Sequence, residues 1–343
     1  MSKVAIVILN WNGQKLLEKF LPAVIQNTTY GDAEIIVADN ASTDNSLAFL
    51  KDHYPLLRTI ALDQNYGFAG GYNKALKQVN AEYYLLLNSD VAPGPRWLEP
   101  LMKIMEQNQK IGACMPKIKA YNSPKSFEYA GACGGFIDIL GYPFCRGRIL
   151  DHIETDDQQY NNELPIFWAS GAALLIHSHI YLSAGGLDED FFAHMEEIDL
   201  CWRIKNMGYQ IMVVPSSEVF HVGGATLSQQ NSHKTFLNFR NNLLMMIKNL
   251  SSKYFLAIIL LRLFLDGIAA FHFLLKKETH HFTAVFKAHL AFYSLLPLFI
   301  QKRKKLKPFH RRINHPEVYP QSVIWAFYIQ KIKLFSQLKH FWL

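Results

Sequence analysis

The chain has 343 residues, of which 50% are hydrophobic, and it carries a formal net charge of +7. This length accommodates a full catalytic domain plus a second region with a sizeable core. The four cysteines are scattered and form no CxxC pair, which argues against a zinc ribbon or a disulfide scaffold and favours reduced thiols in a cytosolic compartment. The basic balance is compatible with a nucleic acid, an anionic membrane surface or an anionic substrate as partner.

Apolar runs alternate with helix-like segments through the N-terminal part of the chain. Residues 4–9, 34–38, 58–62 and 83–87 predict strands, and apolar residues recur at helical spacing between them. This alternation predicts an α/β fold with a doubly wound, mostly parallel sheet. The first strand begins almost at once and no basic region precedes it, so we expect no cleaved secretory signal.

Each predicted strand stops at a polar cluster. Right-handed crossovers bring the carboxyl ends of parallel strands to one edge of the sheet. We therefore expect Asn12, Asp39, Asn65, Asn88 and Asp90 to converge there, although they are far apart in the chain. One such cluster alone is as well explained by an ordinary turn, because Asn, Ser, Asp, Pro and Gly are common turn formers. Several clusters at one edge favour a ligand site.

Two familiar phosphate-binding motifs do not occur: no GxGxxG opens the first helix, and there is no GxxxxGK[ST]. Gly67, Gly70 and Gly71 precede a helix expected over residues 72–79. They either cradle a phosphate with backbone N–H groups or make a tight turn. Residues 119–163 are loop-rich and polar, which favours a substrate-facing excursion rather than core.

A second acidic cluster, with Glu196, Glu197 and Asp199, lies near the start of a predicted helix. Carboxylates there interact favourably with the helix dipole, and many ordinary helices begin this way. The neighbouring aromatic residues and His194 favour a site instead, because a general base needs a carboxylate in a partly desolvated position. His221 closes a later strand before two glycines, and it is either a structural histidine or a metal ligand.

Taken together, these residues resemble the family 2 glycosyltransferases, which have the GT-A fold, and most closely their rhamnosyltransferase-like branch. The matching motifs are residues 8–12 (ILNWN), 37–44 (VADNASTD), 65–73 (NYGFAGGYN), 86–90 (LLNSD), 185–189 (GGLDE), 196–203 (EEIDLCWR) and 221–224 (HVGG). Each motif is weak alone. Together, in this order and at family-like spacing, the motifs are specific for this family.

The resemblance implies a nucleotide-sugar pocket along the strand ends. Asp39 would contact the nucleotide base, and Asn12, Asn65 and Gly67 would line the same pocket. The Asn88-Ser89-Asp90 motif corresponds to the DxD element of the family, so Asn88 stands where many members carry an aspartate.

The resemblance also implies a metal site and a catalytic base. Asp90 would bind Mg²⁺ or Mn²⁺ together with His221, and the cation would stabilise the leaving diphosphate as a Lewis acid. Glu197 is favoured as the base because it occupies the second position of the family's acidic pair. Glu196 and Asp199 are the alternative candidates for the base.

A base at this position would deprotonate an acceptor hydroxyl that attacks the sugar on the face opposite the leaving nucleotide. Such a single displacement inverts the anomeric centre. Arg203 would either order the acidic group or approach the donor diphosphate.

The C-terminal composition differs from the rest. Residues 254–275 and 282–300 are apolar runs long enough to cross a bilayer, which needs about 20 residues, yet Arg262 and Asp266 would be costly in lipid. Three arrangements are therefore open: helices that span the membrane, helices that lie in the membrane interface, and a soluble helical cap. The basic residues within 302–312 favour monotopic contact with the anionic cytoplasmic face, and no nucleic-acid recognition module accompanies them.

We therefore expect a GT-A domain over residues 1–245 and a helical, membrane-associated region over residues 246–343. The predicted function is inverting, metal-dependent transfer from a UDP- or dTDP-activated sugar, with rhamnose among the candidates, to a glycan or lipid-linked acceptor in cell-surface polysaccharide synthesis. A sugar-nucleotide nucleotidyltransferase would need a Gly-rich triphosphate loop with a basic residue near the first strand, and residues 10–13 offer none. A catalytically inactive nucleotide-sugar-binding scaffold on the membrane stays open, and donor hydrolysis would separate it from an enzyme.

Overall fold

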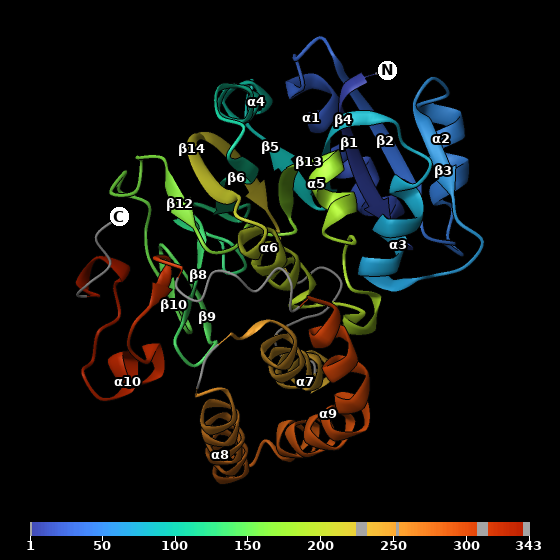
Figure 1. Cartoon of the computed structure of the whole chain (residues 1–343). Helices are drawn as coiled ribbons and strands as arrows, with labels where there is room; N and C mark the ends of the chain where they lie inside the picture. Colours follow the sequence, from blue (N-terminus) through green and yellow to red (C-terminus); the bar gives the residue numbers. More distant parts are fainter. Residues whose placement is uncertain (1, 224–231, 252–253, 307–314, 339–343) are drawn as a thin grey trace.

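A mixed sheet forms the centre of the protein (Figure 1). The structure is a computed structural model that describes residues 2–223, 232–251, 254–306 and 315–338. Within these residues the main sheet has 10 strands, in the order β12-β14-β6-β13-β4-β1-β2-β3 with β5 paired to β14 and β7 to β6. The strands are β1 (Ser2–Asn10), β2 (Ala33–Asp39), β3 (Arg58–Ala61), β4 (Ala81–Asn88), β5 (Val91–Pro93), β6 (Ile111–Ala120), β7 (Ser123–Phe127), β12 (Leu164–Ile166), β13 (Ala173–His177) and β14 (Gln210–His221).

Most of these strands point the same way. β3, β2, β1 and β4 are parallel neighbours. β13 is antiparallel to both β4 and β6, so β6 and its parallel partner β14 share the direction of β4. The central strands are buried on both faces, which explains their continuous apolar runs. The predicted α/β fold is confirmed, and the carboxyl ends of β1, β2, β4 and β14 lie along one edge.

Helices pack on the sheet and extend beyond it. They are α1 (Gln14–Asn27), α2 (Ser46–His53), α3 (Gly67–Leu76), α4 (Leu98–Gln107), α5 (Ser178–Ser183), α6 (Glu196–Asn206), α7 (Ser232–Asn249), α8 (Phe255–Leu275), α9 (Thr279–Leu306) and α10 (Val323–Tyr328), with short 3₁₀ turns at Glu189–Phe191 and Phe335–Gln337. The expectation that α3 starts at residue 72 is wrong, because Gly67 is already its first residue. A Cβ at Gly71 would lie only 2.9 Å from the Leu9 side chain, so glycine lets α3 approach β1 closely.

A second sheet corrects the expectation for residues 119–163. Within the described residues, five short strands form it in the order β11-β10-β9-β8-β15. They are β8 (Gly135–Asp138), β9 (Pro143–Cys145), β10 (Arg148–Ile149), β11 (His152–Ile153) and β15 (Val318–Tyr319). Phe136 and Phe144 are fully buried here, and the Phe335 ring lies 5.1 Å from the Phe136 ring. The segment is therefore a small core covered by the C-terminal residues, and its strands are too short to produce a readable alternation.

The C-terminal helices α7, α8 and α9 lie together at one end of the molecule (Figure 1). By length and composition, α8 and α9 could each cross a membrane. α7 runs through the predicted boundary at residue 245, and β15 joins the second sheet by pairing with β8. The division into two regions stays a prediction.

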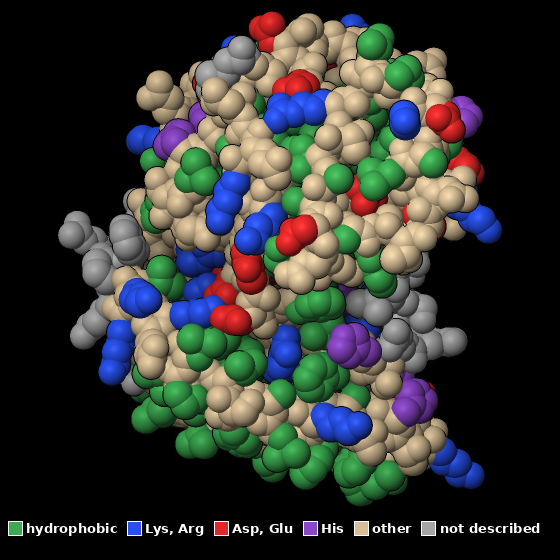
Figure 2. Space-filling view, turned by 90° about the vertical axis from the view of Figure 1, so that its right-hand side faces the viewer, with side chains coloured by type: hydrophobic (Ala, Val, Ile, Leu, Met, Phe, Trp, Pro, Cys, Tyr) green, Lys and Arg blue, Asp and Glu red, His purple; other side chains and the backbone are tan. Residues whose placement is uncertain are grey.

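Helix α8 has its charged residues inside and its apolar residues outside. Arg262 and Asp266 are buried, whereas Leu260 is 67% and Phe264 is 65% exposed. Arg262 donates a hydrogen bond to the Leu140 carbonyl at 2.6 Å, which anchors the helix to the second sheet. Figure 2 shows hydrophobic side chains gathered at the lower end of the molecule, where α8 and α9 lie in Figure 1.

Candidate active site

Asp39 ends β2 beside Asn10, which ends β1, because the two strands pair in that register. The Asp39 carboxylate has no exposed surface. Asn10 Nδ2 donates to its Oδ2 at 2.9 Å, and the backbone N–H of Ser42 donates to its Oδ1 at 2.8 Å. The side chain predicted to contact the nucleotide base therefore holds the loop after β2 in shape.

Asn12 and Asn65 tie neighbouring loops together. Asn12 Oδ1 accepts the backbone N–H of Thr43 at 2.7 Å. Asn65 Oδ1 accepts from Asn40 Nδ2 at 2.9 Å and from the backbone N–H of Gly67 at 2.8 Å. These contacts join the ends of β1, β2 and β3 into one rim along the sheet edge. The structure thus brings the residues predicted for the nucleotide pocket together through their loops.

The Asn88-Ser89-Asp90 motif meets His221 on the same edge. β5 follows the motif directly and turns back along β14, so that Val91 pairs with His221. His221 Nε2 lies 3.1 Å from Asp90 Oδ1 and 3.4 Å from Asn88 Nδ2. Both Asp90 and His221 are buried. The two residues predicted to bind a metal are therefore in contact.

Glu128 is a further member of this cluster, and the sequence reasoning missed it. Its Oε1 lies 3.6 Å from His221 Nδ1, on the other side of the ring from Asp90. Burial alone would lower the pKa of His221, but the hydrogen bonds and charges of Asp90 and Glu128 raise that pKa to about 10. Glu128 lies in the segment interpreted as an excursion, and no motif there marked it.

The cluster fits a divalent cation that takes its remaining ligands from a bound substrate. A bound cation would replace the Nε2 proton that the raised pKa of His221 implies, and Asp90 Oδ1 and His221 Nε2 would then be its oxygen and nitrogen ligands. Among the described residues, no three His, Cys, Asp or Glu side chains form a ready-made metal site. Mg²⁺ is commonly held by one or two carboxylates plus substrate phosphates, so a protein site of two ligands suits a donor diphosphate.

Glu196 and Glu197 open α6, and each has a buried Oε2 atom without a hydrogen-bond partner. Burial raises the pKa of Glu197 to about 7. Burial and the adjacent Glu197 carboxylate raise the pKa of Glu196 well above its ordinary value. A general base works best when its pKa is near the operating pH, and Glu197 meets that condition.

A turn between β12 and β13 connects the two acidic clusters. The Asn88 backbone N–H donates to the Ala172 carbonyl at 3.0 Å. A Cβ at the preceding Gly171 would lie 3.8 Å from Glu197 Cβ and 3.2 Å from the Phe68 ring. Glu197 therefore lies near the Asn88 motif across this turn, and glycine keeps the space between them open.

Asp199 and Arg203 belong to a buried ion-pair network. Asp199 has no exposed surface and accepts hydrogen bonds from Arg203 Nη2 at 2.8 Å, Lys248 Nζ at 2.8 Å and Asn249 Nδ2 at 2.7 Å. Arg203 also donates to the Ala184 and Gly186 carbonyls. These contacts engage both oxygens of Asp199. They leave Glu196 and Glu197 as the carboxylates of the cluster that retain an unpartnered oxygen.

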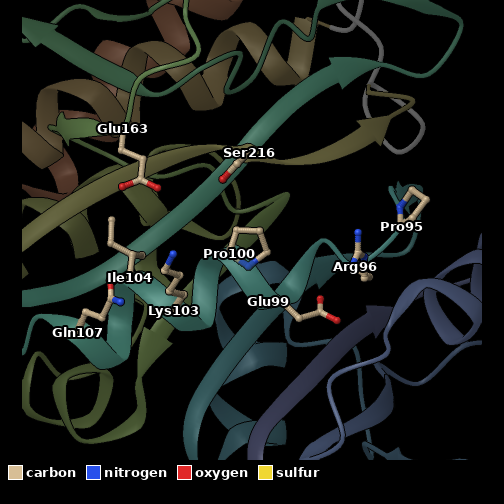
Figure 3. Close-up of a pocket in the computed structure, with 9 residues that line it drawn as sticks. All are labelled: Pro95, Arg96, Glu99, Pro100, Lys103, Ile104, Gln107, Glu163 and Ser216. Atoms are coloured by element: carbon tan, nitrogen blue, oxygen red, sulfur yellow. The ribbon is translucent and has the colours of Figure 1, made fainter.

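A hollow of about 550 Å³ lies elsewhere, beside α4 (Figure 3). Arg96, Glu99 and Lys103 line one side, and Glu163 and Ser216 lie across from α4. Its lining contains none of the residues predicted for the site. The candidate active site is therefore the sheet edge and not this hollow.

Known proteins are similar to this chain in sequence and in fold. The sequence profile described as Glycosyl transferase family 2 matches residues 5–167. The chain is 27% identical over 234 residues to the N-acetylglucosaminyl-diphospho-decaprenol L-rhamnosyltransferase of Mycobacterium tuberculosis, an alignment that covers 63% of this chain and 75% of that enzyme.

Two solved structures are similar in fold. The crystal structure of GalNAc-T7 with UDP, GalNAc and Mn²⁺ matches with a TM-score of 0.58 and 16% identity over 72% of this chain, which spans about half (48%) of that chain. The mannosyltransferase PcManGT from Pyrobaculum calidifontis, in complex with GDP-Man and Mn²⁺, matches with a TM-score of 0.51 and 15% identity over 91% of this chain and 87% of that chain.

Residues 5–167 match family 2 of the glycosyltransferases, and the chain has the GT-A fold. Its sequence is similar to that of a rhamnosyltransferase. The family and the fold predicted from the motifs are confirmed.

Proposed function

We propose that this chain is an inverting, metal-dependent glycosyltransferase that moves a sugar from a UDP- or dTDP-activated donor to a glycan or lipid-linked acceptor. The mycobacterial relative is named a rhamnosyltransferase of a diphospho-decaprenol-linked sugar, which supports rhamnose as the sugar and a lipid-linked acceptor. The observation that carries the proposal is Glu197 Oε2, which is buried and unpartnered beside the turn that holds Asn88.

In this reaction Glu197 takes the proton of the acceptor hydroxyl as the acceptor oxygen bonds to the anomeric carbon. The bond from that carbon to the diphosphate oxygen breaks on the opposite face, and the electron pair leaves with the nucleotide. A carboxylate with a pKa of about 7 is deprotonated often enough near neutral pH to accept this proton. Inversion follows from the single displacement.

Asp90 and His221 would hold the divalent cation, with Asn88 beside them. A bound Mg²⁺ or Mn²⁺ supplies Lewis-acid stabilisation of the negative charge that develops on the diphosphate. Asp90 and His221 would position the diphosphate by holding the cation, and Asn88 Nδ2, 3.4 Å from His221 Nε2, could donate a hydrogen bond there. The two acidic clusters thereby have separate tasks, one for the leaving group and one for the acceptor.

The substitution Glu197→Gln tests the base. It keeps the size of the side chain but removes the site that accepts the proton, so we expect kcat to fall by about 100-fold or more while donor affinity stays unchanged. Turnover is measured by nucleotide release, and donor affinity by calorimetry. Glu196→Gln is the matched control. Full turnover in Glu197→Gln with loss in Glu196→Gln would move the base to Glu196.

The substitution Asp90→Ala tests the cation site. In the wild type we expect Mn²⁺ to raise the affinity for UDP or dTDP, and in Asp90→Ala that gain should disappear because the oxygen ligand is gone. Titration calorimetry with and without Mn²⁺ measures the difference. Ser89→Ala, in the middle of the motif, should keep the gain. An unchanged Mn²⁺ effect in Asp90→Ala contradicts the assignment.

The C-terminal helices support a location on the cytoplasmic face of an anionic membrane. In α8 the apolar side chains of Leu260, Phe264 and Phe271 are exposed, whereas a helix on a water-facing surface exposes its polar side chains. Its charges are used inside the protein, since Arg262 lies 3.6 Å from Asp266 and 3.6 Å above the Tyr142 ring. Lys304 and Lys305, which are exposed at the end of α9, would attract anionic headgroups. Monotopic contact therefore suits these helices.

The paired substitution Phe264→Glu/Phe271→Glu tests this surface. The full-length protein should sediment with vesicles rich in anionic phospholipid, and the variant should lose at least about 10-fold in partitioning because two aromatic contacts become charges. Leu56→Glu, at a fully exposed leucine outside the C-terminal helices, is the control and should bind like the wild type. Wild-type protein that stays in the supernatant in low salt without detergent contradicts the location.

A further inference from the structure

The segment directly before α6 has an unusual backbone. Phe192, His194 and Met195 have φ values of 65°, 68° and 75°, although none of them is glycine. Residues other than glycine rarely adopt this left-handed backbone conformation. They keep it only where the surrounding structure holds them. This segment carries Glu196 and Glu197 at its end, so whatever holds it also sets the position of both carboxylates.

Asn241 on α7 holds this segment. Its side chain has no exposed surface, and its Nδ2 lies 2.9 Å from the Phe191 carbonyl oxygen, 2.8 Å from that of Ala193 and 2.8 Å from that of His194. The two N–H groups of a single amide thus serve three carbonyls around the left-handed turn, with one N–H shared between two of them. These carbonyls lie outside any α-helix or strand. The Asn241 amide therefore supplies the hydrogen-bond donors that secondary structure would otherwise provide.

The neighbouring Arg240 determines which way the Asn241 amide faces. Arg240 Nε lies 2.8 Å from Asn241 Oδ1, and a guanidinium can only donate. The oxygen of the amide must therefore face Arg240, which leaves both N–H groups for the carbonyls. Arg240 Nη2 also donates to the Phe191 carbonyl at 3.0 Å. Two consecutive residues of α7 thus act on the same segment.

We propose that Asn241 is a positioning residue for the catalytic base: by bonding three carbonyls of residues 191–194, it fixes the start of α6 and keeps the Oε2 atom of Glu197 away from water. This inference rests on the proposed role of Glu197. Titratable groups that face Glu197 are Glu196 on the same helix and the buried thiols of Cys145 and Cys201. The Asn241 Nδ2 hydrogen bonds go to backbone carbonyls instead, so the loss of this amide acts through the backbone.

The test compares Asn241→Leu with Asn242→Leu in the full-length protein. Both changes keep the side-chain size, add no charge and remove a buried amide from the same helix. Asn242 donates to the Gly141 carbonyl at 2.9 Å and meets the segment through a 4.0 Å contact with the Met195 sulfur. Three quantities are measured: the pH dependence of kcat, the KM for a UDP- or dTDP-sugar that the wild type turns over, and backbone hydrogen exchange in residues 190–198.

In Asn241→Leu we expect kcat at pH 8 to fall about 100-fold, with the donor KM within about twofold of the wild type. The acidic limb of the profile should move to lower pH by about one unit, because water that reaches Glu197 lowers its pKa. Hydrogen exchange in residues 190–198 should become faster. Asn242→Leu should keep the wild-type limb and the wild-type exchange in this segment.

An unchanged limb and kcat in Asn241→Leu, or an equal shift in Asn242→Leu, overturns the proposal. If Asn241→Leu does not fold, Arg240→Lys takes its place, since it removes the Nε–H bond to Asn241, and it should shift the limb in the same direction by less. Failure of the proposed function looks different. In that case the wild type has no acidic limb near pH 7, and hydrogen exchange alone decides whether Asn241 holds the segment.

Discussion

The buried carboxylate of Asp199 is the contact on which the arrangement around the site depends. It lies on α6 and binds Arg203 from the same helix and Lys248 and Asn249 from α7. Removing one member of a buried network leaves the opposite charges in the interior without compensation, which is strongly destabilising. The network therefore locks α6 against α7. With Asp199 engaged in this way, the neighbouring glutamates keep free oxygens in a desolvated position, which raises their pKa.

The same contacts join the C-terminal helices to the site. Lys248 also binds Asp188 at 2.6 Å, and Lys302 of α9 binds Asp188 and Asp190 in the segment before α6. The Phe191 ring packs against the Phe299 ring of α9, with centroids 5.5 Å apart. Helix α9, which also carries exposed apolar side chains, is thus one of the helices that hold the acidic segment. β1, β2 and β4 lie within the residues that match the family profile, and α7 and α9 contact the acidic segment from outside that match.

Sequence reasoning could predict the sheet edge because strand ends obey a general rule: parallel strands deliver Asp39, Asn88 and Asp90 to one side whatever the loops do. The residue pattern alone could not separate Asp199 from Glu197, which only the family resemblance favoured, because both are acidic residues at a helix start and the partner Lys248 is 49 positions away from Asp199. It missed the second sheet, whose strands of two to four residues are shorter than any periodic pattern. The exposed apolar face of α8 could not be predicted either, because composition does not reveal which side of a helix is buried.

The free energy of unfolding of Asp199→Asn tests this account most directly. The substitution is close to isosteric, so its effect reports the charge at the centre of the network. We expect chemical denaturation of the full-length variant to give a free energy of unfolding lower by about 3–5 kcal/mol, since Arg203 and Lys248 would stay buried without their shared carboxylate. Unchanged stability together with a complete loss of sugar transfer would contradict the account, because Asp199 would then act in the chemistry and not in holding α6.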